Sequence, residues 1–307
     1  MERGGERFVK MSIPFVKMHG LGNDYIYLDE REAEIPDPGP WAPILCDRHR
    51  SIGADGIIVL RRDEELPVRM EMFNADGSRS AMCGNGIRCV ARLARERGYA
   101  TEDAFEIGID GGRCAARIVR SFLECGFLPD DRIEDAPITG AAINLGLPEI
   151  GPSEVIEGIF GSLEGRAVDV GNPHFVHQLT DGALADYPLS VIGPAVEHHE
   201  RFPHRTNLGI ASVERRDFVK LRVWERGSGE TQACGSGATA AVSALRAAGQ
   251  VDDSVTVHVL GGRLEIDFDA YGHAWMTGDA EHAFTGSFDE GPLAETFPKA
   301  SKKTRTN

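Results

Sequence analysis

Two stretches of the chain alternate apolar and charged residues, and they are near copies of each other. Residues 68–73 read Val-Arg-Met-Glu-Met-Phe, and residues 219–224 read Val-Lys-Leu-Arg-Val-Trp. A period of two is typical of a β-strand that buries one face. Each stretch is followed by a Cys-Gly-x-Gly sequence, at Cys83 in one case and at Cys234 in the other. The pattern predicts two strands, each leading into a loop that ends at a cysteine.

Each Cys-Gly-x-Gly sequence opens a run that suits a helix. These runs, 87–98 and 238–249, both end at glycine. Cys83 and Cys234 lie 151 residues apart, and the two alternating stretches have the same separation (234 − 83 = 219 − 68 = 151). The chain is therefore expected to repeat the order strand, loop, cysteine and helix.

The similarity extends to both sides of the cysteines. After each expected helix comes a pair of strand-like runs around a Gly-Gly-Arg turn, at 111–113 and at 261–263. Upstream, Gly22-Asn23 is similar to Gly171-Asn172. Solenoid repeats have periods of roughly 20 to 50 residues, so a repeat this long points instead to a duplicated domain. We expect a functional site that the two copies share.

Composition and charge limit the classes of function. A chain of 307 residues suits two domains of ~150 residues each, and 41% hydrophobic residues suffice for a core in each. The formal charge of −15 argues against general nucleic-acid binding, which requires a basic surface. No apolar run reaches the length of a membrane span, and residues 1–10 form a polar leader rather than a signal peptide. We expect a cytoplasmic protein with no nucleic-acid or membrane partner.

The six cysteines show no disulfide or zinc spacing. Cys46, Cys89, Cys114 and Cys125 stand in apolar or strand-like surroundings, where unpaired cysteine is usually a core residue. In the cytoplasm all six are expected to be reduced. Cys83 and Cys234 remain as the two thiols with a chemical role.

A thiol at a helix N-terminus is suited to proton transfer. The free backbone N–H groups and the helix dipole favour the thiolate, whose pKa can fall from ~8.5 to ~3.5–7.5. Two facing N-termini would also bind a carboxylate and stabilise the enediolate that forms when its α-proton is removed. One cysteine would take the proton and the other would return a proton to the opposite face, which inverts the stereocentre. This chemistry predicts an isomerase that needs no cofactor and no metal.

Several segments of the chain, in order, resemble the diaminopimelate epimerase family over about residues 13–290. The segments are Phe15-Val-Lys-Met-His-Gly-Leu-Gly-Asn23-Asp-Tyr25, Cys46-Asp-Arg-His49, Ile52-Gly-Ala-Asp-Gly56, Phe73-Asn-Ala-Asp-Gly-Ser78, Cys83-Gly-Asn-Gly-Ile-Arg-Cys89, Gly171-Asn-Pro-His174 and Trp224-Glu-Arg-Gly-Ser-Gly-Glu-Thr-Gln-Ala-Cys-Gly-Ser-Gly237. The resemblance implies an epimerase independent of pyridoxal phosphate that interconverts LL- and meso-diaminopimelate in lysine and cell-wall precursor synthesis. It also implies a homodimer.

The resemblance assigns roles to individual residues. Cys83 and Cys234 would be the acid and base, with His174 and Glu225 supporting the reacting centre. Backbone donors to the reacting carboxylate would come from Gly84, Asn85, Gly235 and Ser236. The substrate-holding residues would be Asn23, Asn74, Asn172, Asn207, Glu225 and Arg226. Two positions depart from the family: some members carry Gln at the position of Gly56, and Ser51 replaces a more usual glycine.

Repeat and resemblance together predict an α+β fold of two pseudo-symmetric domains. Each would be a mixed β-sheet wrapped around a central helix that begins at the cysteine, with the active site in the cleft between the domains. The first domain would span 1–133 and take back the last strand near 280–290, and the second would span 134–279. Residues 291–307 are expected to form a disordered tail.

Other functions are compatible with parts of the pattern. Proline racemase and hydroxyproline epimerase resemble this chain and use paired cysteines, but they usually carry His at the position of Asn85. In a non-catalytic redox or binding protein, Cys83 and Cys234 would instead form a disulfide. Alone, Asn23 and Asn74 could simply form turns beside glycine, His174 could be structural, and Glu225 and Arg226 could be a solvated pair. Titration of free thiols distinguishes an epimerase from the redox protein.

Overall fold

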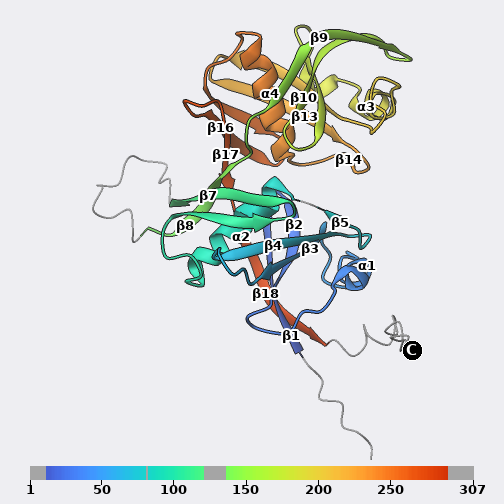
Figure 1. The fold of residues 1–307 in the computed structure, drawn as a ribbon. Coiled ribbons are helices and arrows are strands. Elements are labelled where there is room, and N and C mark those ends of the chain that lie inside the picture. The colour runs from blue at the N-terminus through green and yellow to red at the C-terminus, as the bar shows by residue number, and fades with distance from the viewer. Residues whose placement is uncertain (1–11, 81, 121–135, 290–307) are drawn as a thin grey trace, which may run out of the picture.

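The computed structural model describes residues 12–80, 82–120 and 136–289. It shows an α+β fold in which mixed β-sheet surrounds two main helices, α2 (Gly84–Glu96) and α4 (Gly235–Ala247) (Figure 1). Shorter helices cover the sheet, namely α1 (Ala42–Leu45), α3 (Leu189–Glu197) and the 3-10 turns η1 (Gly39–Trp41) and η3 (Leu184–Asp186). None of the helices in the described ranges is long and apolar enough to cross a membrane. The expected fold class is confirmed.

The strands fall into two groups around the two helices (Figure 1). Those around α2 are β1 (Ser12–Gly20), β2 (Asn23–Asp29), β3 (Gly56–Arg61), β4 (Val68–Asn74), β5 (Arg79–Ser80), β6 (Ala104–Ile109), β7 (Gly112–Arg120), β8 (Ile138–Asn144) and β18 (Glu281–Asp289). The others are β9 (Glu149–Gly158), β10 (Gly161–Asp169), β11 (Pro173–Gln178), β12 (Asn207–Arg215), β13 (Phe218–Glu225), β14 (Gly229–Glu230), β15 (Ser254–Val259), β16 (Gly262–Phe268) and β17 (Ala274–Asp279).

The two halves pair their strands in the same way. β2 runs parallel to β3, β3 pairs antiparallel with β4, and β4 runs parallel to β6. The second half repeats this order with β11, β12, β13 and β15. The hairpins β6–β7 and β15–β16 then turn at the two Gly-Gly-Arg sequences. The repeat in the sequence is therefore a repeat in topology.

Two strands connect the halves. β8 pairs with β7 on one side and with β17 on the other, so that the two sheets are continuous. The final strand, β18, pairs with β1 beside the first half (Figure 1). The expected division at residue 133 falls among residues 121–135, which lie outside the described residues, as does the expected tail at 291–307. The domain boundaries therefore stay a prediction.

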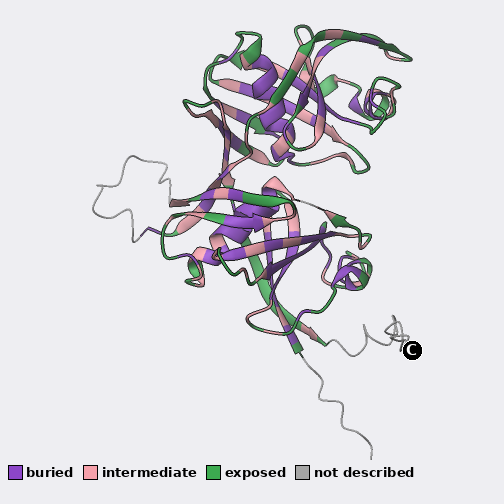
Figure 2. Cartoon of the chain, viewed as in Figure 1, coloured by how far each residue is buried: buried purple, intermediate pink, exposed green. Residues whose placement is uncertain are grey.

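Both central helices are buried on most of their surface (Figure 2). Alanine dominates α4, and its two buried hydroxyls are satisfied within the helix. Thr239 Oγ1 donates to the Gly235 carbonyl at 3.0 Å, and Ser243 Oγ donates to the Thr239 carbonyl at 2.7 Å. Gly98 and Gly249, which follow the two helices, both have φ of +72°, a conformation that favours glycine. The core thus positions the two cysteines at equivalent helix starts.

Candidate active site

Cys83 and Cys234 are the N-cap residues of α2 and α4. Both have extended backbone, and each sulfur accepts a hydrogen bond from the third residue of its helix. The donor is the Gly86 N–H at 3.4 Å from Cys83 Sγ and the Gly237 N–H at 3.3 Å from Cys234 Sγ. The expected start of each helix at its cysteine is confirmed.

The N-termini of the two helices meet. Asn85 Nδ2, in the first turn of α2, donates to the Ala233 carbonyl just before α4 at 2.9 Å. A Cβ atom added to Gly235 would lie 3.3 Å from Asn85 Oδ1 and would collide with Met276 Sδ, while one added to Gly84 would lie 3.1 Å from Met276 Cε. A side chain at either position would therefore require Met276 to shift. The arrangement brings the partly positive ends of two helices together, which favours a carboxylate.

Cys83 has polar partners from strand β2. The phenol of Tyr25 donates to Cys83 Sγ at 3.3 Å, and the Cys83 thiol donates to Asn23 Oδ1 at 3.2 Å. The Asn23 amide is held in this orientation because its Nδ2 donates to Asp55 Oδ2 at 2.8 Å. An acceptor facing the sulfur favours its protonated form, whereas the donors favour the thiolate.

Cys234 has a different set of partners. Ser236 Oγ lies 3.5 Å from Cys234 Sγ, and Glu225 on β13 also hydrogen-bonds to the thiol. The Thr231 hydroxyl donates to Glu225 Oε1 at 2.5 Å. Glu225 thus lies beside the sulfur, held there by Thr231.

Buried His174 and Asn207 form one cluster with the half-buried Asn172 and Ser236 beside the second thiol. His174 Nε2 lies 3.1 Å from both Asn172 Oδ1 and Ser236 Oγ, and 3.4 Å from Asn207 Nδ2. Its Nδ1 is buried and has no hydrogen-bond partner among the described residues. Burial, with a smaller effect from Arg226, lowers the pKa of His174 to about 3. The ring is therefore neutral at physiological pH and acts as a hydrogen-bonding group.

Burial has the largest effect on the pKa of both thiols. It raises the pKa of Cys83 above its ordinary value, and hydrogen bonds from Tyr25 and Gly86 oppose it. It raises the pKa of Cys234 further, with an added contribution from the negative charge of Glu225. Helix position alone suggested a lowered thiol pKa. The structure differs because desolvation of a thiolate outweighs the donors at a helix N-terminus.

Two of the expected substrate residues have other contacts. Asn74 shapes the β4–β5 hairpin, with its Nδ2 donating to Ser78 Oγ at 2.9 Å. Arg226 is exposed, and its guanidinium donates to the His204 carbonyl at 2.9 Å, while its backbone N–H donates to Asn207 Oδ1 at 2.7 Å. Their roles toward a substrate stay predictions, as do those of the other candidate residues.

Three polar side chains near the thiols lie outside the expected set: those of Tyr25, Asp55 and Thr231. A signal for Tyr25 was present in the sequence. Asn23 and Asn172 are 149 residues apart (172 − 23), and the same offset places Tyr25 at the position of His174. Asp55 and Thr231 are recognised only from their contacts with Asn23 and Glu225.

The remaining cysteines fit the core assignment where the structure describes them. Cys46, Cys89 and Cys114 are buried, and all five described cysteines are free of disulfides. Burial raises the pKa of Cys89 to about 11 and that of Cys46 and Cys114 to about 12. Cys125 lies outside the described residues.

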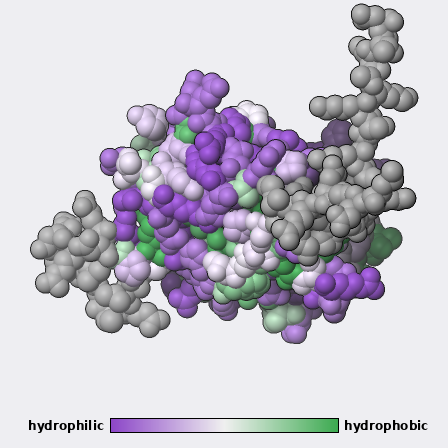
Figure 3. Space-filling view, turned by 90° about the horizontal axis from the view of Figure 1, so that it is seen from below, coloured by the Kyte–Doolittle hydropathy of each residue, from purple (hydrophilic) through white to green (hydrophobic). Residues whose placement is uncertain are grey.

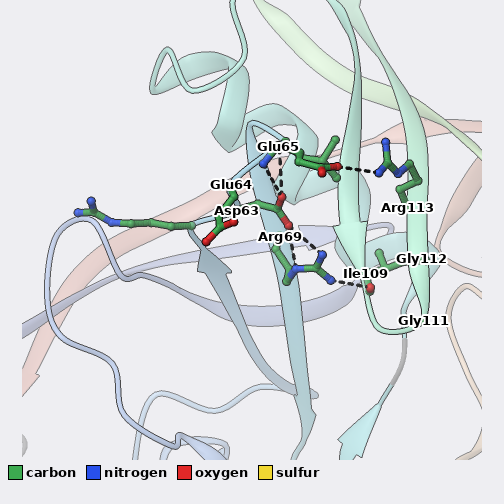
Figure 4. Close-up of a pocket in the computed structure, with 10 residues that line it drawn as sticks. Asp63, Glu64, Glu65, Arg69, Ile109, Gly111, Gly112 and Arg113 are labelled. Atoms are coloured by element: carbon green, nitrogen blue, oxygen red, sulfur yellow. Dashed lines mark hydrogen bonds and ion pairs between the residues drawn. The ribbon is translucent and has the colours of Figure 1, made fainter.

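A surface cavity of about 540 Å³ lies away from both thiols (Figure 4). Its charged side chains already pair with one another: Arg69 Nη2 with Asp63 at 2.8 Å, and Arg113 Nη2 with Glu65 at 3.1 Å. None of the candidate site residues lines it. It therefore adds nothing to the chemistry of the cysteines.

Comparison with known proteins relates this geometry to one family. The sequence model of the family described as diaminopimelate epimerase matches residues 15–124 and 166–283, one segment in each half. Diaminopimelate epimerase of Moorella thermoacetica is 36% identical over 289 residues, covering 89% of this chain and 98% of the relative. That of Synechococcus elongatus is 39% identical over 284 residues, covering 91% and 99%.

Solved structures show the same fold at low identity. A hydroxyproline epimerase from Agrobacterium vitis has a TM-score of 0.65 and 13% identity, covering 92% of this chain and 94% of that one. A PhzF-family phenazine biosynthesis protein from Bacillus anthracis has a TM-score of 0.64 and 13% identity, covering 91% and 99%. At this identity the likeness extends to the fold alone.

Proposed function

The chain belongs to the diaminopimelate epimerase family, and from this we propose that it interconverts LL- and meso-diaminopimelate in lysine biosynthesis. The observation that carries the proposal is the pair of thiols at two helix N-termini that meet at Asn85 and Gly235. Such a site holds an α-carboxylate between two groups that can exchange a proton with its α-carbon.

The reaction requires one proton to leave and another to arrive. One cysteine, as thiolate, takes the α-proton: the Cα–H bond breaks, an S–H bond forms, and the electron pair moves into the carboxylate as an enediolate. The first-turn N–H groups of α2 and α4 stabilise that charge where it develops. The other cysteine, as thiol, then gives its proton to the opposite face of the carbon. The reverse reaction exchanges the two roles.

The candidate binding residues have complementary chemistry. First-turn N–H groups at Gly84, Asn85, Gly235 and Ser236 would hold the reacting carboxylate. Glu225 would accept from an ammonium group, and Arg226 would pair with a carboxylate. Neutral amides can serve either charged group, which suits Asn23, Asn74, Asn172 and Asn207 to a substrate with two amino-acid ends. His174 would keep Ser236 and Asn172 in place.

Incubation of the reduced protein with LL-diaminopimelate in D2O tests the proposal. NMR and chiral chromatography should show the meso isomer with deuterium at one α-carbon. Proline and 4-hydroxyproline, run in parallel, test the related activities of the same fold. Exchange on proline alone, or on none of the three compounds, would contradict the proposed substrate.

We also propose a homodimer in the cytoplasm, as the family resemblance implies. β18 pairs with β1 and with no other strand that the structure describes, and it carries Phe284 at 50% exposure. The face seen in Figure 3 mixes hydrophobic with hydrophilic side chains. Light scattering after gel filtration tests the dimer, and cell fractionation tests the compartment.

A further inference from the structure

We propose that Tyr25 is a further catalytic residue, whose phenol donates a hydrogen bond to Cys83 and stabilises its thiolate during proton transfer. The proposal rests on the proposed function, because the hydrogen bond contributes to turnover only where Cys83 exchanges a proton with substrate. Tyr25 Oη lies 3.3 Å from Cys83 Sγ. Tyr25 is 4% exposed, so water does not compete freely for this contact.

The hydrogen-bond partners of Cys83 Sγ are of two kinds: donors, which favour the thiolate, and an acceptor, which favours the thiol. Tyr25 O–H and Gly86 N–H donate to the sulfur, whereas Asn23 Oδ1 accepts from it. Asp55 fixes the Asn23 amide, so this oxygen cannot readily be replaced by the amide nitrogen. When the proton leaves Cys83, Tyr25 supplies the side-chain hydroxyl that stabilises the negative sulfur.

The second half of the molecule carries a polar group at the equivalent position. Tyr25 in β2 and His174 in β11 are 149 residues apart, as are Asn23 and Asn172. His174 Nε2 reaches Ser236 Oγ at 3.1 Å, and this hydroxyl lies 3.5 Å from Cys234 Sγ. In the second half His174 therefore reaches the Cys234 thiol through Ser236, whereas in the first half Tyr25 contacts the Cys83 thiol directly.

Gly56 packs directly against Tyr25. Gly56 pairs with Tyr25 across the parallel strands β2 and β3. A Cβ atom at residue 56 would lie 3.0 Å from Tyr25 Cε1 and would collide with the Phe73 carbonyl. Asn207 occupies the equivalent place opposite His174. The departure from the family at Gly56 thus lies against the ring of Tyr25.

Tyr25 acts as a donor and keeps its own proton. Burial and the neighbouring Cys83 raise the pKa of the Tyr25 phenol well above its ordinary value. In the step at Cys83 the Cα–H bond breaks and the S–H bond forms, while the Tyr25 O–H bond stays intact. The Tyr25 donor favours the thiolate from which this step starts, and it is already in place when Cys83 gives up its proton in the reverse direction and charge develops on sulfur.

The substitution Tyr25→Phe tests the proposal, with Tyr27→Phe as the matched control. Tyr27 lies on the same strand with its ring centroid 6.4 Å away, is 2% exposed, and donates to the Gly86 carbonyl at 3.1 Å instead of to the thiol. The readout is the rate of Cys83 alkylation by iodoacetamide against pH, followed by mass spectrometry of the Cys83 peptide. Steady-state kcat and KM for diaminopimelate are measured alongside, and thermal melts verify folding.

In Tyr25→Phe the alkylation midpoint of Cys83 should rise by about one pH unit, as expected for loss of one hydrogen bond to a charged group. We expect kcat to fall about tenfold with little change in KM, and Tyr27→Phe to leave the midpoint and kcat near wild type. An unshifted midpoint in folded Tyr25→Phe, or equal shifts in both variants, would overturn the role of Tyr25. Absence of epimerisation by the wild type would instead overturn the proposed function, and the alkylation midpoint would still report on the bond.

Discussion

At the scale of single residues, the two thiols share a helix position but differ in their neighbours. Cys83 faces two donors and an amide oxygen, whereas Cys234 lies beside a carboxylate and a serine. This asymmetry suits a reaction in which one sulfur starts as thiolate and the other as thiol.

Loss of either thiol should stop most of the turnover. Cys83→Ala and Cys234→Ala should each lower epimerisation of diaminopimelate by about 10²–10⁴-fold, because each removes one of the two proton-transfer groups. Chiral chromatography gives the rates. Cys114→Ala, which removes a buried thiol of the core, serves as the control. Near-full activity in either of the first two variants would refute the two-base mechanism.

Glu225 should control the acidity of Cys234. Its negative charge raises the pKa of Cys234, so Glu225→Gln should move the alkylation midpoint of Cys234 to lower pH. Glu230→Gln is the control, since Glu230 pairs with Arg222 at 2.6 Å. A midpoint that stays in place or rises in Glu225→Gln would contradict this assignment.

His174 should make stability depend on pH. Its pKa is about 3 in the fold, against an ordinary value near 6.5, so the unfolded chain binds more protons between these values. The stabilising contribution is complete above ~6.5 and is lost as the pH falls towards the lower value.

Between pH 6.5 and 4.5 the wild type should lose about 2 kcal/mol more unfolding free energy than His174→Gln, in urea titrations at each pH. An equal loss in the two proteins would show that the imidazole does not remain neutral in the fold.

At the scale of elements, Arg88 joins helix α2 to strand β17. The residue is fully buried, and its guanidinium donates to Asn85 Oδ1 at 2.9 Å and to the Asp279 carbonyl at 3.1 Å. Space for it comes from Gly20 and Gly278, where an added Cβ would lie 2.7 Å from Nη2 and 3.1 Å from Cζ. The Arg88 guanidinium thereby fixes the side-chain amide of Asn85, which donates to the Ala233 carbonyl in the second half.

Arg88→Met should lower the free energy of unfolding by about 1–3 kcal/mol, because it leaves buried oxygens without donors. Arg95, in the same helix, forms a partly exposed pair with Asp103, and Arg95→Met should cost less than about 1 kcal/mol. Urea unfolding measures both. Equal losses of unfolding free energy in the two variants would show that Arg88 contributes no more to stability than the partly exposed Arg95–Asp103 pair.

At the scale of the whole molecule, the continuous β-sheet and the meeting of α2 with α4 couple the two halves. β8 belongs to both sheets, and separate apolar cores surround the two helices. Each half supplies one of the two thiols, so the proposed site depends on this coupling.

The halves should unfold together. Trp41 reports on the first half and Trp224 on the second. Two variants in which Trp275 is replaced and which retain either Trp41 or Trp224 as the sole tryptophan should give coincident urea transitions by fluorescence. Two separated transitions would show that the halves are independent folding units.

The sequence by itself determined the duplicated fold, the helix starts and the position of the two thiols at those starts. These features depend on residues close together in the chain: period-two alternation gives the strands, and an N-cap acts on a residue three positions later. The 151-residue repeat then related Cys83 to Cys234 without any tertiary information.

Only the tertiary structure decided the environment of each thiol. Tyr25 and Asn23 reach Cys83 across 58 and 60 residues, and Asn85 reaches Ala233 across 148. It also placed Asn74 in a hairpin turn. Desolvation, which raises both thiol pKa values, depends on everything packed around the sulfur. Local sequence specifies what a residue can do, and long-range packing specifies which charge state and which partners it has.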